Sequence, residues 1–182
     1  DIHRATASSV FDIPFEEVKP VERSRAKAVN FGVVYGMSGF GLSENLSITR
    51  EEGQKYINDY FTKHSAVKDY LDRQIEEGEK NLEVRTHYGR VRKIPELISR
   101  KYMEKEAAKR LAMNTPIQGT AADIIKFAMN SVRSELIARN LKSKLILQIH
   151  DELIVEGPDS ELKEVAEVLD TCMSGAAELA VE

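Results

Sequence analysis

Apolar side chains recur at helical spacing along most of the chain, and turn residues divide the pattern into separate segments. A capping-box pattern at Thr49 begins the longest of these segments, whose apolar positions continue to Ile75. We expect helices over residues 2–11, 23–35, a short piece ending near Leu46, 50–75, 102–114 and 120–139, and a final helix capped by Asp159 or Ser160. The two helices on either side of residues 115–119 are predicted to be separate, because Pro116 and Gly119 interrupt the pattern.

Two segments have the pattern of β-hairpins. Residues 82–86 and 90–94 flank a His-Tyr-Gly turn, and residues 144–149 and 152–156 flank His150-Asp151. The order helix, hairpin, helices, hairpin, helix predicts an α+β fold. The arms of the first hairpin carry four cations that we expect to reach a phosphate backbone: Arg85, Arg90, Arg92 and Lys93.

The most informative pattern lies in the second predicted helix, where four residues are spaced by four and therefore share one face: Arg23, Lys27, Phe31 and Tyr35. The two cations near the start of the helix would suit a polyphosphate, helped by free N–H groups at the helix N-terminus. The two aromatic rings further along would suit a sugar and a base. The alternative is an ordinary helix with aromatic residues in the core and solvated basic residues.

Two further sets of residues are candidates for chemistry. His150, Asp151 and Glu152 lie at the tip of an apolar hairpin, where carboxylates are costly unless paired or bound to a metal such as Mg²⁺. The alternative is an exposed turn in which Asp151 only accommodates the turn dihedrals. Three residues that again step by four could line a groove, although the break at Pro116 leaves their alignment open: Arg110, Asn114 and Gln118.

Composition and charge narrow the class of protein. The 182 residues are 42% hydrophobic and 31% charged, which is typical of globular proteins, and the single cysteine, Cys172, excludes an internal disulfide. Apolar stretches are too short to span a membrane, so no membrane partner is expected. The net charge of −4 hides a segregation: residues 85–110 hold nine Lys or Arg against three Glu, whereas residues 151–182 hold ten acidic residues against one Lys. The basic stretch could bind phosphates, or both stretches could simply be solvated helix faces.

Several motifs together resemble the family A DNA polymerases of the bacterial DNA polymerase I type. Arg23-x3-Lys27-x7-Tyr35-Gly36 is similar to motif B of that family, and Gln148-Ile-His-Asp-Glu152 is similar to its motif C. The segments 1–7 and 115–123 resemble flanking segments of the family in the same order. The resemblance implies a helical fingers subdomain over residues 1–98 and part of a palm, with its antiparallel hairpin, over residues 99–182.

The resemblance also implies a function and a set of site residues. The family transfers a nucleotide from a dNTP to a primer 3′-OH with two Mg²⁺ ions, in DNA replication and repair in the bacterial cytoplasm at the nucleoid. By motif position, His3, Arg23 and Lys27 would hold the triphosphate, Phe31 the sugar, and Tyr35 the template base. Asp151 and Glu152 would bind the metals. Four residues would contact the DNA primer-template, His150 at the primer end and Arg110, Asn114 and Gln118 along the minor groove.

One element of the family pattern is absent from these residues. The motif A strand, whose aspartate would complete the two-metal site, should lie upstream of Asp1, and the chain does not begin with Met. We therefore expect a polymerase fragment that needs the rest of the parent chain and is inactive alone. Two alternatives stay open: a nucleic-acid-binding module without catalysis, and a helical interaction scaffold that does not bind DNA.

Overall fold

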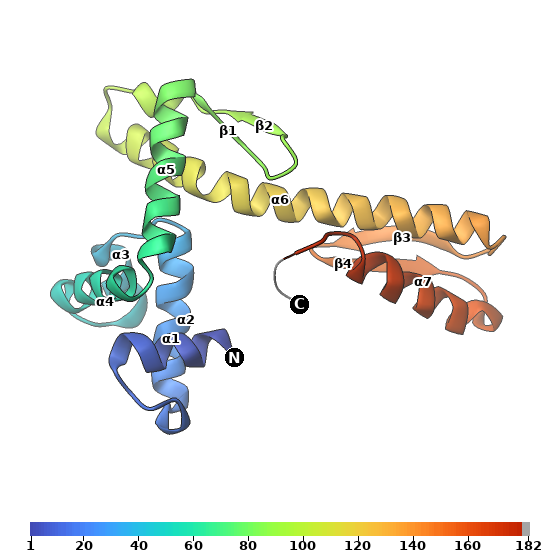
Figure 1. The fold of residues 1–182 in the computed structure, drawn as a ribbon, viewed down its shortest axis with the longest axis horizontal. Coiled ribbons are helices and arrows are strands. Elements are labelled where there is room, and N and C mark those ends of the chain that lie inside the picture. The colour runs from blue at the N-terminus through green and yellow to red at the C-terminus, as the bar shows by residue number, and fades with distance from the viewer. Residues whose placement is uncertain (180–182) are drawn as a thin grey trace. The chain divides into compact units, whose positions relative to one another are not determined.

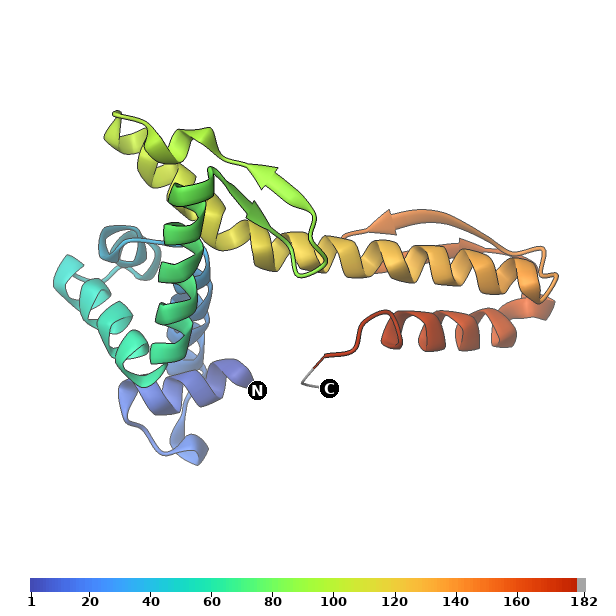
Figure 2. The same cartoon turned by 45° about the horizontal axis from the view of Figure 1, so that its top comes forward.

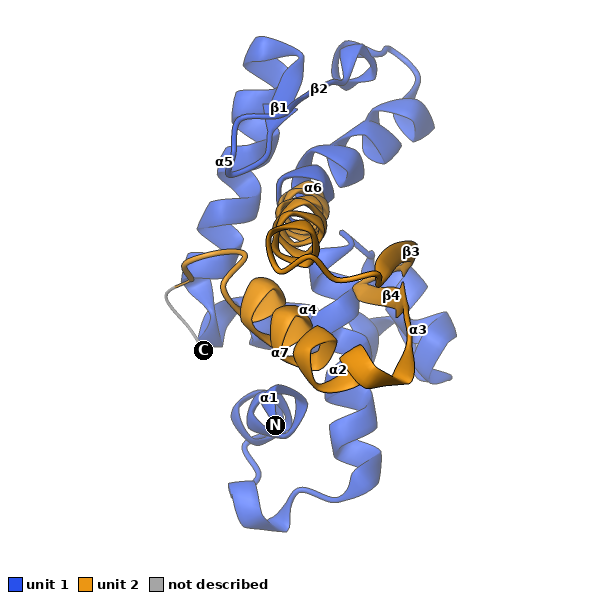
Figure 3. Cartoon of the chain, turned by 90° about the vertical axis from the view of Figure 1, so that its right-hand side faces the viewer, with its two compact units in different colours: residues 1–117 blue, residues 118–182 orange. Residues whose placement is uncertain are grey.

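The computed structural model describes residues 1–179, which divide into two compact units, Asp1–Ile117 and the residues from Gln118 onward (Figure 3). The described part is mostly helical, with two separate two-stranded antiparallel sheets, so the α+β prediction is confirmed. The helices are α1 (Ile2–Phe11), α2 (Pro20–Val34), α3 (Gly39–Leu46), α4 (Arg50–Lys63), α5 (Ser65–Asn81), α6 (Tyr102–Ala138) and α7 (Leu162–Ser174). The strands are β1 (Glu83–Arg85), β2 (Val91–Lys93), β3 (Lys144–Ile149) and β4 (Glu152–Glu156), and short 3₁₀ turns cover Phe15–Glu17, Pro95–Ile98 and Asp159–Glu161 (Figure 1).

The first unit is built around a core to which helices α1 to α5 contribute. Its fully buried aliphatic side chains include Val29 of α2 and Leu42 of α3, with Leu71 of α5 almost fully buried beside them. The predicted capping box at the start of α4 is confirmed, because the Thr49 hydroxyl accepts from the Glu52 N–H and the Glu52 carboxylate accepts from the Thr49 N–H. Val10 of α1 and Val29 of α2 share the core of this unit, and the two helices lie side by side (Figure 2).

The prediction of one long helix after Thr49 is wrong, because the chain leaves helical geometry at His64. The φ and ψ angles of His64 are −124° and 55°, and α5 starts again at Ser65. The His64 ring packs against Tyr60, with 4.7 Å between ring centroids. A uniform apolar spacing concealed this break, since both helices bury one face in the same core.

A second small core in the first unit anchors the β1–β2 hairpin. Val84, Ile94 and Leu97 pack against Ala108 and Ala112 of α6, and all five are almost fully buried. The hairpin pairs Glu83 with Lys93 and Arg85 with Val91, which confirms its predicted position. All three residues of β2 are exposed, so the basic arm of the hairpin faces solvent.

The predicted break at residues 115–119 is also wrong, because α6 runs as one helix of 37 residues with Pro116 inside it. Residues 102–117 of α6 belong to the first unit and residues 118–138 to the second. Proline at 116 removes one backbone donor, a cost of about 3 kcal/mol or more in a helix interior. Burial of residues such as Ala112 and Val132 on either side of the proline stabilises the helix and offsets that cost.

The second unit packs the β3–β4 hairpin and α7 against the last part of α6 (Figure 2). Val132 and Leu136 of α6 meet Val168 and Cys172 of α7 in its buried core. The strands lie as predicted, with a bulge between Leu145 and Leu147. In the part of the chain that the structure describes, no helix is long and apolar enough to cross a bilayer.

The start of α7 differs from the prediction. Asp159–Glu161 forms a 3₁₀ turn, and among the described residues no side chain caps that turn or α7. Leu162, the first residue of α7, is 70% exposed. The buried face of α7 is centred instead on Val168 and Cys172.

Candidate functional site

The predicted stripe on α2 lies on a single exposed face. Phe31 and Tyr35 keep 47% and 43% of their surface exposed, whereas Ala26, Val29 and Val33 on the opposite face are buried. The alternative that these aromatic residues belong to the core is therefore wrong. Their rings are nearly parallel, with an interplanar angle of 8° and 6.2 Å between centroids, so they present one aromatic surface.

The backbone N–H of Arg23 is not free to bind an anion at the N-terminus of α2, contrary to the prediction. The structure starts α2 at Pro20, three residues earlier than predicted, and the Arg23 N–H already donates to the Lys19 carbonyl at 3.1 Å. Glu22 also adds a negative charge to the first turn of the helix. An anion on this face would therefore meet the side chains of Arg23 and Lys27 rather than free backbone N–H groups.

Among the described residues, one cation of the stripe forms an ion pair and the other does not. Arg23 Nε donates to Asp1 Oδ2 at 2.6 Å, an ion pair in which both side chains remain well exposed. Lys27 pairs with no carboxylate within salt-bridge distance among residues 1–179, and its Nζ lies 5.9 Å from the Phe31 ring centroid. Lys27 thus offers an uncompensated charge next to the aromatic surface.

Helix α1 brings His3 to the side of this stripe. The His3 ring lies 5.9 Å from Phe31, and its Nδ1 is 3.0 Å from the Asn30 side-chain nitrogen. The Thr6 hydroxyl proton is shared between the Ile2 carbonyl at 2.9 Å and the Asn30 side-chain oxygen at 3.1 Å, and the Asn30 amide nitrogen faces His3. Because an amide nitrogen only donates, Nδ1 accepts and the neutral ring carries its proton on Nε2.

The surroundings of His3 favour its neutral form. Desolvation lowers the pKa of His3 below its ordinary value of 6.5, and the positive charges of Arg23 and Lys27 lower it further. Sequence reasoning missed Asn30 and Asp1, which hold His3 and Arg23. Asn30 follows Lys27 by three positions, a spacing that places it on the flank of the same helix face.

The end of α2 lies against α6 within the first unit. Gly36 has a φ of 64°, and a Cβ at this position would collide with the Met113 methyl group and lie 3.0 Å from Arg110 Cγ. Arg110 is therefore next to the turn that follows Tyr35. The Asn114 amide donates to the Arg110 carbonyl at 3.0 Å, and its side-chain oxygen is buried without a hydrogen-bond partner among the described residues.

Arg92 of the basic hairpin lies near α6, and Gln118 lies further along that helix. Arg92 Nη1 lies 3.4 Å from Thr115 Oγ1, which links the basic hairpin to the same stretch of α6. Gln118 is exposed and is the first residue of the second unit. The structure thus brings Arg110 near Tyr35 and keeps Asn114 one turn away on α6.

The tip of the β3–β4 hairpin presents three exposed polar side chains: His150, Asp151 and Glu152. His150, not Asp151, adopts the left-handed conformation, with a φ of 55°, and its carbonyl accepts from Gln148 Nε2 at 2.6 Å. Since both carboxylates are open to water, burial does not require a counter-ion, contrary to the expectation from the apolar strands. Carboxylate oxygens still fit Mg²⁺ chemically.

The residues at this tip supply only part of a metal site. Within the described residues, no group of three or more His, Cys, Asp or Glu side chains could hold a metal ion. Beside the tip, four aliphatic side chains are at least 37% exposed: Ile146, Leu147, Ile149 and Ile154. The hairpin therefore offers two carboxylates near exposed aliphatic side chains.

Comparison with known proteins identifies the family. The profile of DNA polymerase family A matches residues 1–182. This chain belongs to DNA polymerase family A. It is 45% identical over 181 residues to DNA polymerase I of Caldicellulosiruptor bescii and 45% identical over 181 residues to DNA polymerase I of Bacillus subtilis, and all of the chain is covered in each case.

A solved structure of the family supports the fold. The chain superposes on the POL domain of Pol1 from M. smegmatis, in complex with DNA primer-template and dNTP, with a TM-score of 0.91 and 40% identity. That match covers 98% of this chain and 32% of the other. The chain spans about a fifth of the length of the curated family A relatives it matches, 21% in both cases named above.

Proposed function

We propose that this chain is part of a DNA-directed DNA polymerase, which transfers a nucleotide from a dNTP to a primer 3′-OH. The observation that carries the proposal is the exposed face of α2, on which two cations precede two parallel aromatic rings. A dNTP has the same polarity, from its anionic triphosphate to its sugar and base. Membership of family A and the DNA-bound and dNTP-bound state of the superposed POL domain support it.

In this proposal each residue of the stripe has one role. Lys27, whose charge is uncompensated, would bind the triphosphate and offset charge on the leaving pyrophosphate. Arg23 and His3 would assist at the phosphates, with His3 donating from Nε2 because Asn30 occupies Nδ1. Phe31 would pack against the sugar, and Tyr35 would lie near the template base and help to close the site.

The hairpin of the second unit would provide the metal site. Asp151 and Glu152 would hold Mg²⁺ together with an aspartate from a segment upstream of Asp1, since two carboxylates do not complete a two-ion site. When bound, the ions would activate the primer 3′-oxygen and stabilise charge on the transferred phosphate. His150 would approach the primer end from the same turn.

DNA would be held mainly through its shape and backbone, because base pairing with the template selects the nucleotide. Arg110, Asn114 and Gln118 would contact the primer-template along the minor groove. The buried Asn114 oxygen has no hydrogen-bond partner among the described residues, which supports a role for that residue in hydrogen bonding. We propose that residues 1–98 act as fingers and residues 99–182 as part of the palm, in a protein of the bacterial cytoplasm that works at the nucleoid in replication and repair.

Primer extension with Mg²⁺, a primer-template and four dNTPs tests the proposal. We expect the 182-residue chain alone to be inactive and a longer chain that includes the upstream segment to extend the primer. Asp151→Ala in the longer chain should abolish extension, whereas Asp159→Ala, outside the hairpin, should not. A longer chain that binds the primer-template but never extends it would favour the rival function, a nucleic-acid-binding module whose basic residues 85–110 hold DNA.

A further inference from the structure

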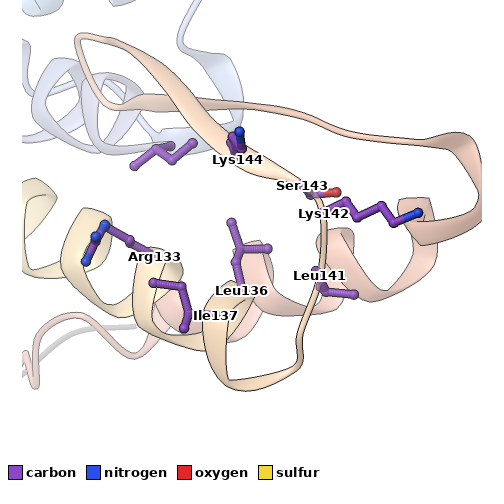
Figure 4. Close-up of a pocket in the computed structure, with 8 residues that line it drawn as sticks. Arg133, Leu136, Ile137, Leu141, Lys142, Ser143 and Lys144 are labelled. Carbon is purple, nitrogen blue, oxygen red and sulfur yellow. The ribbon is translucent and has the colours of Figure 1, made fainter.

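A cavity of about 480 Å³ opens in the second unit, between the last turns of α6 and the segment that leads into β3 (Figure 4). Its apolar lining consists of Leu136 and Ile137 from α6 and Leu141 and Leu145 from the following segment. Leu136 is 3% exposed and belongs to the core, whereas Ile137 is 59% exposed. The cavity therefore has a fixed aliphatic floor and an open apolar edge, and its volume lies in the range of ligand sites.

Three cations surround this aliphatic lining: Arg133, Lys142 and Lys144. In Figure 4, Arg133 and Lys142 lie on opposite sides of Leu136. None of the three forms an ion pair within salt-bridge distance in the part of the chain that the structure describes. Among the described residues that line the cavity, none is acidic, although Glu156 lies opposite Lys144 in the register of the hairpin. The rim is thus cationic around an apolar interior.

The segment that forms one wall is held in place by Glu161. Its carboxylate accepts from the Lys142 N–H, the Ser143 N–H and the Ser143 hydroxyl, at 3.0, 3.0 and 2.6 Å. These bonds lower the pKa of Glu161, with the Ser143 hydroxyl as the largest cause. A Cβ at Gly157 would overlap the Ser143 hydroxyl, so the neighbouring chain packs closely here. The wall is preorganised, which reduces the entropic cost of binding.

We propose that this cavity binds an acidic peptide segment of a partner protein, with a bulky apolar side chain in the cavity and carboxylates against Arg133 and the two lysines. The apolar interior selects the side chain, and the cationic rim selects the charge. The proposal does not depend on the polymerase function, because it uses none of the residues assigned to nucleotide, metal or primer-template.

The composition of the cavity favours a peptide over a nucleic acid. Single-stranded nucleic acids are held by a positively charged groove together with aromatic side chains on which bases stack. Among the described residues this lining has the cations but no aromatic side chain. A phosphate backbone would engage the cations but would leave the aliphatic floor exposed to water. A peptide with both an acidic and an apolar side chain covers both parts of the surface.

Binding of a fluorescein-labelled pentapeptide, with phenylalanine between two pairs of acidic residues, tests the proposal by fluorescence anisotropy on the longer chain that includes the upstream segment. Arg133→Glu and Ile137→Ser should each weaken binding by roughly three- to tenfold. The first removes a cation of the rim, and the second removes an apolar contact. Lys163→Glu, a charge reversal on α7 outside the cavity, is the matched control and should leave binding unchanged. Circular dichroism should show that all variants fold alike.

A second peptide and a competing oligonucleotide test whether the apolar side chain and the peptide itself are recognised. A peptide with serine in place of phenylalanine should bind several-fold more weakly, and a single-stranded oligonucleotide should not displace the labelled peptide. The proposal is overturned if the peptide does not bind saturably, if the serine peptide binds equally well, or if Lys163→Glu weakens binding as much as Arg133→Glu. Displacement by the oligonucleotide that Arg133→Glu abolishes would assign the cavity to nucleic acid instead.

Discussion

Replacing Lys27 by alanine should impair nucleotide use and leave the fold intact. The side chain is exposed and has no carboxylate partner among the described residues, so its removal should change the free energy of unfolding by less than about 0.5 kcal/mol. A charged donor to a triphosphate contributes about 1–3 kcal/mol at a partly exposed site. The ratio kcat/KM for dNTP should therefore fall by about 5- to 150-fold.

The assay is single-nucleotide incorporation by the longer, active chain, with duplex binding measured separately by fluorescence anisotropy. Lys55→Ala is the matched control, because Lys55 is an exposed lysine on α4 that is not part of the stripe and whose Nζ lies 3.9 Å from Asp59 Oδ2. Duplex affinity should change little in either variant. Equal losses of duplex binding and nucleotide incorporation in Lys27→Ala would refute the assignment of Lys27 to the triphosphate.

Four further predictions concern Phe31, Gly36, Thr49 and His3. Phe31→Tyr should admit dideoxynucleotides more readily, and unchanged discrimination in chain-termination assays would show that Phe31 does not pack against the sugar. Gly36→Ala should destabilise the first unit by about 1–2 kcal/mol in urea unfolding, because φ is 64° and a methyl group would also require the Met113 and Arg110 side chains to shift. An unchanged midpoint would contradict the strain expected at this φ. Thr49→Ala should cost about 1 kcal/mol through loss of the cap, visible as a thermal midpoint lower by roughly 2–4 °C, and Thr62→Ala on the exposed face of α4 provides the comparison. An NMR titration should give His3 a pKa below 6.5, so its contribution to stability is present above pH 6.5 and is lost as pH falls through the lowered folded-state pKa; a pKa above 6.5 would be inconsistent with its cationic surroundings.

Local sequence signals were enough for the elements whose stability is local. The capping box at Thr49, the spacing of residues 2–11 and the turns of both hairpins predicted elements that the structure contains. The shared face of Arg23, Lys27, Phe31 and Tyr35 also followed from the helical repeat alone, since residues four apart lie on one side of a helix. The family followed from the motifs, because their residue types and spacing are specific.

Only the tertiary structure decided which local signals prevail and which groups meet. Packing on both sides of Pro116 keeps α6 continuous, and the break at His64 interrupts an apolar pattern that is otherwise unbroken. The contact between Asn30 and His3 joins residues 27 positions apart in the chain. The exposure of Phe31 and the cavity beside Arg133 depend on how the neighbouring elements pack. Periodicity reports which face of an element is apolar, but burial and partnership depend on what the rest of the chain packs against that face.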